Sequence, residues 1–373
     1  METVANHTRL SRLLAWCEQH EASDLHLRAG SSPSVRIDGE LRRFPESVQA
    51  PPEPLELQAW LTEAFFETTV ARILERRELD LSFFHGDRRY RANFSKQRGL
   101  QACSFRAVPQ QRKKLQDLRL PDSLTDLLAT PRGLVLVTGP TGQGKSTTAR
   151  ALLQELNSTR ALRVITIEDP IEYVFTDDRC EFEQREVGLD TASFADGIRN
   201  AMRQDPDVLF IGEIRDRESI FAALQAVETG HLVFSTLHAD SVPQALARLR
   251  EHFPATEQGN VSSLLARNLT AVINQRLLPA VRGGRVPCIE VLRRDAGVED
   301  AVRKNDLHLL SGIIEVSTER GMHTFDQYLI ELLAAGDITN ETATHHAVNR
   351  HKLELARRGF GTQPAILRPD KDR

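Results

Sequence analysis

The sequence has few cysteines and no long apolar run, the features that mark zinc-binding, disulfide-linked and membrane-spanning proteins. Its 373 residues include only four cysteines, at positions 17, 103, 180 and 288, and none forms a Cys-x-x-Cys pair. This spacing argues against a zinc site and against a disulfide framework, and it is typical of a reducing compartment. No apolar run approaches the roughly 18 residues needed to span a bilayer. Polar and charged residues are spread throughout residues 1–14, so this segment lacks a signal-peptide core. We therefore expect a cytoplasmic protein.

The chain also has no strong excess of one charge. Lysine and arginine number 48 and aspartate and glutamate 52, a net charge of −4. This balance gives no electrostatic case for nucleic-acid binding, so we expect no nucleic-acid partner. Forty per cent apolar and 27% charged residues are ordinary for a globular protein, and the length favours two domains over one.

What the chain does contain is a glycine-rich run that matches G-x-x-x-x-G-K-[ST], the phosphate-binding P-loop. The run is Gly139, Pro140, Thr141, Gly142, Gln143, Gly144, Lys145 and Ser146, followed by Thr147. An apolar run over 134–138 reads as a buried strand before it, and apolar residues at helical spacing follow it. Strand, glycine loop and helix are the context that the motif requires. The sequence therefore predicts a nucleoside triphosphate site.

The chemistry of this loop assigns roles to its residues. Glycines let successive backbone N–H groups point at phosphate oxygens, helped by the positive end of the following helix. Lys145 should reach the β- and γ-phosphates, and the Ser146 hydroxyl should bind Mg²⁺. The alternative is a glycine-rich turn that happens to fit the pattern.

The pattern of apolar runs predicts two domains with different organisation. Residues 1–110 alternate as a small α+β domain, with helices over 10–17 and 55–78, strands at 24–27, 35–37, 81–84, 90–94 and 103–108, and a hairpin turn at Asp38-Gly39. A polar, basic stretch places a linker at 111–118. Residues 119–360 read as an α/β domain with parallel strands at 164–167, 208–211 and 232–235, mostly helical after Asn260. We expect a disordered tail over 361–373.

Two predicted strands end in acidic residues, where open α/β sheets bind their ligands. The strand at 208–211 runs into Gly212-Glu213 and resembles a Walker B segment, which usually ends in Asp-Glu. Because glycine stands at the aspartate position, Mg²⁺ would rely on Ser146, phosphate and water. Glu213 is the first candidate to polarise the attacking water, and Glu168 is the second. The alternatives are a solvated acid at a strand end for Glu213 and a capped turn beside Glu168.

Histidines and arginines complete the set of candidate residues. His231 and His238 lie at opposite ends of one predicted strand, where they could sense a γ-phosphate, although a lone histidine is more often structural. In the first domain, Arg91, Arg98 and Arg106 lie on or between strands. Such arginines usually face solvent, but beside a neighbour's nucleotide they could act as arginine fingers in trans.

Four segments resemble, in order, the Walker A, Asp box, Walker B and His box of secretion ATPases. They are 139–146, 167–173, 205–216 and 229–238. Three further segments, 22–27, 184–187 and 321–326, resemble the PilT/PilU branch, the type IV pilus retraction ATPases. Within that branch, 186–191 and 317–322 resemble PilU more closely, and Gly297-Val298-Glu299-Asp300-Ala301-Val302 stands where PilT carries A-I-R-N-L-I.

This resemblance implies an α/β fold with a RecA-like P-loop ATPase core and a smaller N-terminal, PAS-like α+β domain. It implies a homohexameric ring that binds ATP with Mg²⁺ between the domains, contains no zinc and powers pilus retraction and twitching motility. The partners it implies are an inner-membrane pilus platform protein and, for a PilU-like accessory, a PilT-type ATPase. The protein would then be cytoplasmic and peripheral at the inner membrane through the pilus machinery.

Three other functions stay open at this point. One is an ATPase of pilus assembly or type II secretion, although such relatives commonly carry a four-cysteine zinc insert and a longer first domain. Another is a nucleotide-binding adaptor subunit with little hydrolysis, against which Lys145 and Glu213 argue. The third is a DNA-directed RecA-type ATPase, which the charge balance disfavours.

Overall fold

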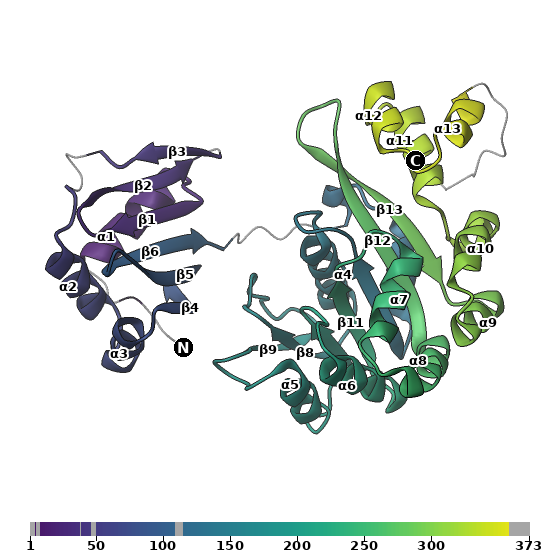
Figure 1. Cartoon of the computed structure of the whole chain (residues 1–373), viewed down its shortest axis with the longest axis horizontal. Helices are drawn as coiled ribbons and strands as arrows, with labels where there is room; N and C mark the ends of the chain where they lie inside the picture. Colours follow the sequence, from purple (N-terminus) through teal and green to yellow (C-terminus); the bar gives the residue numbers. More distant parts are fainter. Residues whose placement is uncertain (1–3, 5–7, 38, 46–49, 109–114, 358–373) are drawn as a thin grey trace. The chain divides into compact units, whose positions relative to one another are not determined.

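The fold is taken from a computed structural model (Figure 1), which describes residues 4, 8–37, 39–45, 50–108 and 115–357. The chain divides into two units. The first comprises Met1–Gln111 with Pro170–Val174, and the second comprises Arg112–Asp169 with Phe175–Arg373. The segment 170–174, which the sequence assigns to the second domain, thus clusters with the first unit. Residues 111–114 of the predicted linker and the predicted tail at 361–373 lie outside the described residues, and Gln116–Leu118 is a 3-10 helix.

The described part of the first unit is built on a six-stranded antiparallel sheet in the order β3-β2-β1-β6-β5-β4. Its strands are β1 (Asp24–Arg28), β2 (Ser31–Ile37), β3 (Glu40–Arg43), β4 (Glu78–His85), β5 (Arg88–Gln97) and β6 (Leu100–Ala107). Its helices are α1 (Arg9–Gln19), α2 (Pro54–Ala64) and α3 (Glu67–Glu75). Alternate strand residues such as Leu25, Phe94 and Phe105 join the helices in one apolar core.

The opposite face of this sheet is polar, and a row of charged residues crosses it. Arg36 pairs in register with Asp24, Asp24 with Arg106, and Arg106 with Arg91. Because these residues share a cross-strand row, their side chains lie on the same face of the sheet. The row thus contains three arginines and one carboxylate, with Asp24 between Arg36 and Arg106.

The predicted helix over 55–78 is in fact two helices. Phe65 and Phe66 have extended backbone between α2 and α3, and Glu78 already begins β4. The break lets Phe65 enter the core, where its ring meets Phe83 edge-on at 5.2 Å between centroids. A continuous helical period could not place that ring there, so aromatic packing overrides the helical pattern. The predicted hairpin turn agrees with the pairing of Ile37 with Glu40, although Asp38 lies outside the described residues.

The second unit contains, within its described residues, a seven-stranded sheet in the order β13-β12-β7-β11-β10-β8-β9. All its neighbouring strands pair in parallel except β12 and β13, which are antiparallel. The strands are β7 (Gly133–Thr138), β8 (Arg163–Glu168), β9 (Glu181–Glu186), β10 (Val208–Ile211), β11 (Leu232–Leu237), β12 (Leu269–Pro279) and β13 (Arg285–Arg293). Its central strands are buried along their whole length, as expected of a sheet covered on both faces.

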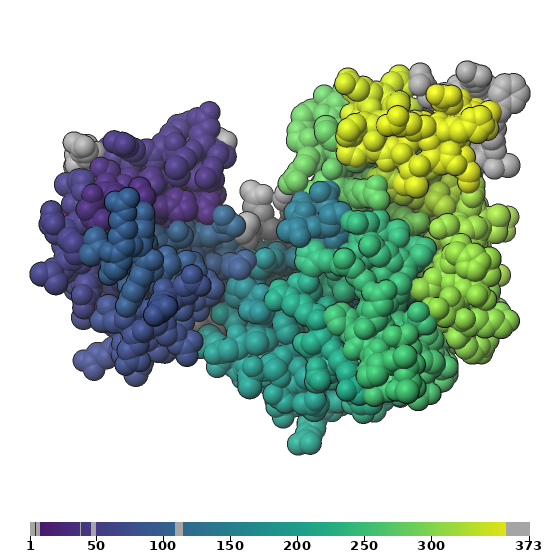
Figure 2. Space-filling model, viewed as in Figure 1, coloured from purple at the N-terminus to yellow at the C-terminus, as the bar shows by residue number. Residues whose placement is uncertain are grey.

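Helices cover this sheet and extend beyond it. They are α4 (Lys145–Thr159), α5 (Phe194–Ala201), α6 (Arg217–Glu228), α7 (Val242–Glu251), α8 (Ala255–Asn268), α9 (Ala296–Lys304), α10 (Leu310–Val316), α11 (Phe325–Ala334), α12 (Asn340–His346) and α13 (Arg350–Arg357). Helix α4 packs on β7 and β11. Residues of α5 to α8 share a core with Leu134 and Leu136. Helices α12 and α13 each pack on α11, and this end of the described chain, yellow in Figure 2, lies on the outside of the unit.

The described chain after Asn260 is mostly helical, as expected, but the expectation missed β12 and β13, which form a long hairpin within the main sheet. Strand β12 pairs in parallel with β7, the strand that leads into the glycine loop, from Leu269 to Asn274. Its apolar pattern is interrupted by Asn274, Gln275 and Arg276, which hides the strand period in the sequence. These polar side chains are nevertheless accommodated, because Asn274 and Gln275 are buried and hydrogen-bonded.

The edge strand β9 has two of its outward amides capped by side chains. The amide of Phe182 donates to Asp177 at 3.0 Å and that of Glu186 donates to Asp190 at 2.8 Å. The odd-numbered amides at 181 and 187 instead donate to the backbone on the β8 side. Carboxylates thus occupy donors that a bare sheet edge would leave free.

Two glycines in the helices of this unit predict opposite responses to the same substitution. A Cβ at Gly197 of α5 would lie 2.9 Å from Ile167 Cγ2, whereas a Cβ at Gly259 of α8 would meet nothing within 4 Å. We expect Gly197→Ala to destabilise the protein by ~1–3 kcal/mol through overpacking. Gly259→Ala, the matched control, should stabilise it by ~0.5–1 kcal/mol because alanine favours the helix. Urea unfolding checks both, and equal signs would contradict the packing argument.

Candidate active site

The glycine loop lies where the motif predicts, between the end of β7 and the start of α4. Gly139, Gly142 and Gly144 all have positive φ, and Gly144 is the N-cap residue of α4. Two of these glycines also face strand β12 closely. A Cβ at Gly139 would lie 2.3 Å from the Gln275 carbonyl oxygen, and one at Gly144 would lie 2.9 Å from Gln275 Nε2. Both the backbone angles and the neighbouring strand therefore require glycine at Gly139 and Gly144.

Lys145 is buried at the start of α4 and turns back onto the loop. Its Nζ donates to the carbonyls of Gly139 at 2.9 Å and Pro140 at 3.0 Å, and lies 3.2 Å from His238 Nδ1. Burial lowers the pKa of this amine, while the nearby Glu213 carboxylate opposes that shift. The Lys145 ammonium is therefore placed where it could bind an anionic group, such as a phosphate, that enters the loop.

His238 connects Lys145 to Glu213. Its Nδ1 faces the Lys145 ammonium, and its Nε2 lies 3.2 Å from Glu213 Oε1. Burial lowers the pKa of the imidazole, and the charge of Lys145 lowers it further. An ammonium can only donate, so Nδ1 accepts and Nε2–H donates to the carboxylate, which is the arrangement of a neutral imidazole. Thr141 Oγ1, also on the loop, lies 3.4 Å from the same Nδ1.

Glu213 follows β10 and has a side chain that is 19% exposed. It is held from both sides, by His238 and by Arg215 Nη2 at 3.0 Å, and Arg215 also reaches Asp169 at 3.6 Å. Gly212, the residue that departs from the usual pattern, approaches β8 closely: a Cβ there would lie 3.3 Å from the Glu168 Cα. A larger residue at this position would push against the neighbouring strand.

Glu168 and Glu213 have different hydrogen-bond partners. Glu168 is buried at the end of β8 and accepts hydrogen bonds from Thr166 Oγ1 at 2.8 Å and Gln184 Nε2 at 3.1 Å. Its carboxylate is therefore engaged by its own strand and by β9. Glu213 contacts the lysine-bound histidine, whereas Glu168 binds Thr166 and Gln184.

His231 does not join this group. It precedes β11, whose six residues carry the chain to His238 at the far end, a separation of about 20 Å. Its Nδ1 lies 2.8 Å from the Ala226 carbonyl and 3.1 Å from Thr229 Oγ1, so it closes the end of α6. The expectation that both histidines of the strand lie beside the phosphate loop fails for this chain, because a strand delivers its two ends to opposite edges of the sheet.

Ser146 and Thr147 occupy the first turn of α4. Ser146 is half-buried and Thr147 is exposed, and within the described residues no hydrogen bond engages the Ser146 hydroxyl. The described residues also contain no group of three or more histidine, cysteine, aspartate or glutamate side chains that could hold a metal ion. A cation at this site would rely on the serine hydroxyl together with ligand and water oxygens.

The three arginines of the first unit have different environments. Arg106 Nε donates to Asp24 at 2.7 Å, and its side chain is 68% exposed. Burial raises the pKa of the Asp24 carboxyl, but hydrogen bonds from Arg106 and Ser23 outweigh it and bring that pKa below its usual value. Arg91 donates to Glu172, in the same unit, at 3.1 Å. Arg98 has a φ of 52° beside Gly99 in the two-residue turn between β5 and β6, so its backbone has a structural role.

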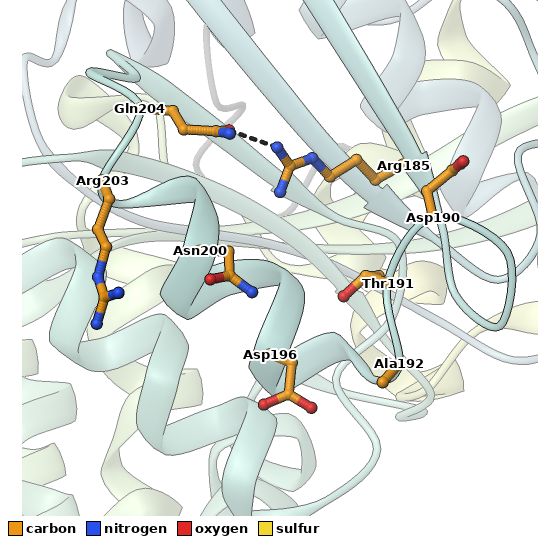
Figure 3. Close-up of a pocket in the computed structure, with 8 residues that line it drawn as sticks. All are labelled: Arg185, Asp190, Thr191, Ala192, Asp196, Asn200, Arg203 and Gln204. Carbon is orange, nitrogen blue, oxygen red and sulfur yellow. Dashed lines mark hydrogen bonds between the residues drawn. The ribbon is translucent and has the colours of Figure 1, made fainter.

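A polar pocket of about 610 Å³ lies elsewhere in the second unit, between β9, the loop after it and α5 (Figure 3). None of the predicted site residues lines it. Arg185 reaches toward Gln204 and bonds it, and also bonds Glu183, while Asp190 accepts the Glu186 amide. Arg185, Gln204 and Asp190 are thus already engaged in hydrogen bonds along the edge of the sheet.

The sequence missed three residues that support the site, Arg215, Gln275 and Asn274. Arg215 stands two residues after Glu213 in a charged run, which gives no sign of its contact. Gln275 lies 132 positions from Gln143 in the loop, and Asn274 lies 136 positions from Thr138 at the end of β7. The one sign of Asn274 and Gln275 in the sequence was the run of polar residues 274–276 within an otherwise mostly apolar stretch, 269–279.

Comparison with known proteins agrees with this geometry. The family described as Type II/IV secretion system protein matches residues 102–313. The type IV pilus retraction ATPase PilT of Pseudomonas aeruginosa is 39% identical over 91% of this chain and 98% of the relative. The type IV pilus ATPase PilU of the same organism is 38% identical over 92% of this chain and 90% of the relative.

Solved structures give the same result. A crystal structure of the pilus retraction motor PilT with bound ADP has a TM-score of 0.85 and 38% identity, covering 92% of this chain and 98% of that one. The predicted fold class is confirmed: an antiparallel sheet domain followed by a mixed, mostly parallel sheet core. Within the described residues, no helix is long and apolar enough to cross a membrane.

The expected closer likeness to PilU is not supported, because the identity to PilT is 39% and that to PilU 38%. Both values hold over nearly the whole chain and nearly the whole relative. The glycine loop, the sheet order and these similarities together show that the chain belongs to the PilT/PilU family of type IV pilus ATPases, ATP-hydrolysing members of the type II/IV secretion superfamily.

Proposed function

We propose that this chain is the subunit of a hexameric motor that hydrolyses ATP with Mg²⁺ to power retraction of a type IV pilus. The observation that carries the proposal is the contact chain from Lys145 through His238 to Glu213, at 3.2 Å for each step. The similarity to PilT over almost the full length of both proteins supports the biological role. The motor would work in the cytoplasm against an inner-membrane platform protein of the pilus machinery.

The loop fits a nucleotide phosphate. Three positive-φ glycines, the N-terminus of a 15-residue helix and a buried lysine that contacts two loop carbonyls and an imidazole form a cradle that a Cβ would fill. Bound ATP would supply the phosphoanhydride bond, and bound Mg²⁺ would neutralise charge on the phosphates. Lys145 would bind the phosphates, and Ser146 would hold the cation.

Glu213 and Arg215 act on the attacking water, and His238 responds to the position of Lys145. Glu213 orients water and accepts its proton, and Arg215 keeps that carboxylate in place. His238 reports whether Lys145 is on the loop or on the phosphates, since its Nδ1 loses a donor when the ammonium leaves. His238 is the sensor in this scheme, Glu168 supports the end of β8, and His231 takes no part in this chain's own site.

An accessory role beside another retraction ATPase is the second candidate. Helix α9 carries Gly297–Val302, with Val298, Ala301 and Val302 buried and Glu299 and Asp300 on its polar side. The A-I-R-N-L-I motif of PilT would place arginine and asparagine at those two polar positions. A change from a basic and a neutral residue to two acids supports a PilU-like dependence on a PilT-type partner.

The first prediction concerns the catalytic roles. We expect Lys145→Ala to weaken ATP binding and abolish turnover, because it removes the only side-chain cation that the loop places on the phosphates. Glu213→Gln should still bind ATP but hydrolyse it at least ~100-fold more slowly, since the amide cannot accept the proton. Glu218→Gln, the same change at an exposed position on α6, is the matched control. Steady-state hydrolysis and nucleotide titration measure both, and wild-type turnover by Glu213→Gln would move the assignment to Glu168.

The second prediction concerns arginines acting in trans. Arg106 is exposed and braced by Asp24, so we expect Arg106→Ala to lower hydrolysis in the ring without unfolding the first unit. Arg91→Ala should act in the same direction, and so should Arg98→Gly, in which glycine suits the positive φ of the turn and removes the third candidate side chain without disturbing the backbone. Mixing Arg106→Ala subunits with Lys145→Ala subunits should restore part of the activity, because one intact site can form from two damaged chains. Mixed rings with no recovery at any ratio would refute the sharing.

The third prediction concerns the direction of the motor. Deleting the gene should leave cells whose pili extend but withdraw poorly, so that twitching falls while surface pili persist or increase. Loss of surface pili would instead indicate an assembly motor. If the chain is an accessory, retraction should fail when a PilT-type partner is deleted and persist in part when only the partner's P-loop lysine is replaced. Full retraction without any partner would overturn the accessory role.

A further inference from the structure

We propose that strand β12 positions the catalytic groups from two sides, with Gln275 holding the phosphate loop and Asn274 holding the His238 segment. This inference rests on the proposed ATPase site. It assigns positioning roles to two adjacent residues that touch neither the phosphates nor the attacking water. Strand side chains alternate between faces, so neighbours in sequence can serve opposite sides of one sheet.

Gln275 is fixed at both ends of its amide. Its Nε2 donates to the Gln143 carbonyl at 2.7 Å, and its Oε1 accepts from Thr148 Oγ1, on α4, at 2.7 Å. The strand returns the contact, because the Leu277 amide donates to the Gln143 side chain at 2.6 Å. Gln143, between Gly142 and Gly144, is thus bound to β12 through both its backbone carbonyl and its side chain.

Asn274 lies on the other face. Its Nδ2 donates to Thr138 Oγ1 at 3.0 Å, at the last residue of β7, and to the Ala239 carbonyl at 2.9 Å. Ala239 follows His238 directly. One buried amide therefore ties the strand that carries the glycine loop to the segment that carries the histidine, and helps to hold the 3.2 Å approach of Lys145 to His238.

Neighbouring side chains extend this hold on the histidine segment. Three successive carbonyls, of His238, Ala239 and Asp240, accept from Arg248, Asn274 and Arg276 respectively. The amide of Val242 then donates to Glu290, a buried carboxyl on β13, at 3.1 Å. Burial raises the pKa of Glu290, and the Val242 hydrogen bond opposes that shift.

The desolvation of these amides argues for a role beyond packing. Asn274 is 1% and Gln275 2% exposed, on a strand flanked by sheet on both sides. A buried polar group is unfavourable unless its partners are fixed, and an apolar pair of the same shape would serve a purely structural strand. Their partners are the loop and the histidine segment, the two parts that must stay in register for hydrolysis.

The experiment separates binding from turnover in the full-length protein. Gln275→Ala should weaken ADP binding about 10-fold, because the Gln143 carbonyl loses its donor and the loop loosens. Asn274→Ala should bind ADP within about 2-fold of wild type but turn ATP over about 10-fold more slowly, because His238 is no longer held. Thr148→Val and Thr138→Val, which remove the second partner of each amide, should reproduce these effects in weaker form.

Asn157→Ala is the structural control. Asn157 is an equally buried amide that binds the 176–180 loop and touches neither the phosphate loop nor His238. It should lower the melting temperature while leaving ADP affinity and turnover within about 2-fold. If Gln275→Ala and Asn274→Ala behave like Asn157→Ala, or if both change the same parameter, the two-sided positioning is overturned. Undiminished hydrolysis by Lys145→Ala would instead refute the underlying site, which keeps the two failures distinct.

Discussion

The active site depends on one constraint, that the parallel strands of the second unit all end at the same edge of the sheet. Strand β7 ends in the glycine loop, β10 leads to Glu213, and β11 leads to His238. No local sequence preference could bring these groups within hydrogen-bonding distance, because Lys145 lies 68 positions from Glu213 and 93 from His238, and Glu213 lies 25 from His238. The ladder of backbone hydrogen bonds does so, and it fixes their order across the sheet. His231 illustrates the same rule from the other side, since the start of a parallel strand is excluded from that edge.

Much of the second unit could be predicted from sequence because its signals are local. The glycine loop, the apolar strands that precede each acidic or histidine segment and the alternation with helices are all contained in short windows. The hairpin of β12 and β13 was missed for a physical reason: Asn274 and Gln275 are polar residues in buried positions, and their partners lie far away in the chain. The break at Phe65–Phe66 was missed because aromatic packing in the core, rather than helical periodicity, decides the backbone there.

The functional residues show a similar division. Lys145 and Glu213 follow from motif and strand position, and His238 was a candidate from the sequence as well; the structure adds that its ring lies between the two. What the sequence could not give is which charges are already neutralised. Arg106 and Arg91 read alike as basic residues on strands, yet one is braced by a buried aspartate and the other by Glu172. Arg98 differs again, because its backbone forms a tight turn. Whether a family member works with PilT or in its place is equally hidden, since identity to PilT and PilU is nearly the same.

The capped edge of β9 bears on how copies of this chain can meet. A strand from another copy that approached this edge would find the amides of Phe182 and Glu186 already bonded to Asp177 and Asp190. Continuous pairing would require breaking both bonds and burying two carboxylates. In the proposed ring, two subunits would therefore not fuse into one extended sheet at this edge, and any contact there would be made by side chains. Such contacts could be remade at each step of a working cycle, whereas a shared backbone ladder would lock neighbours together.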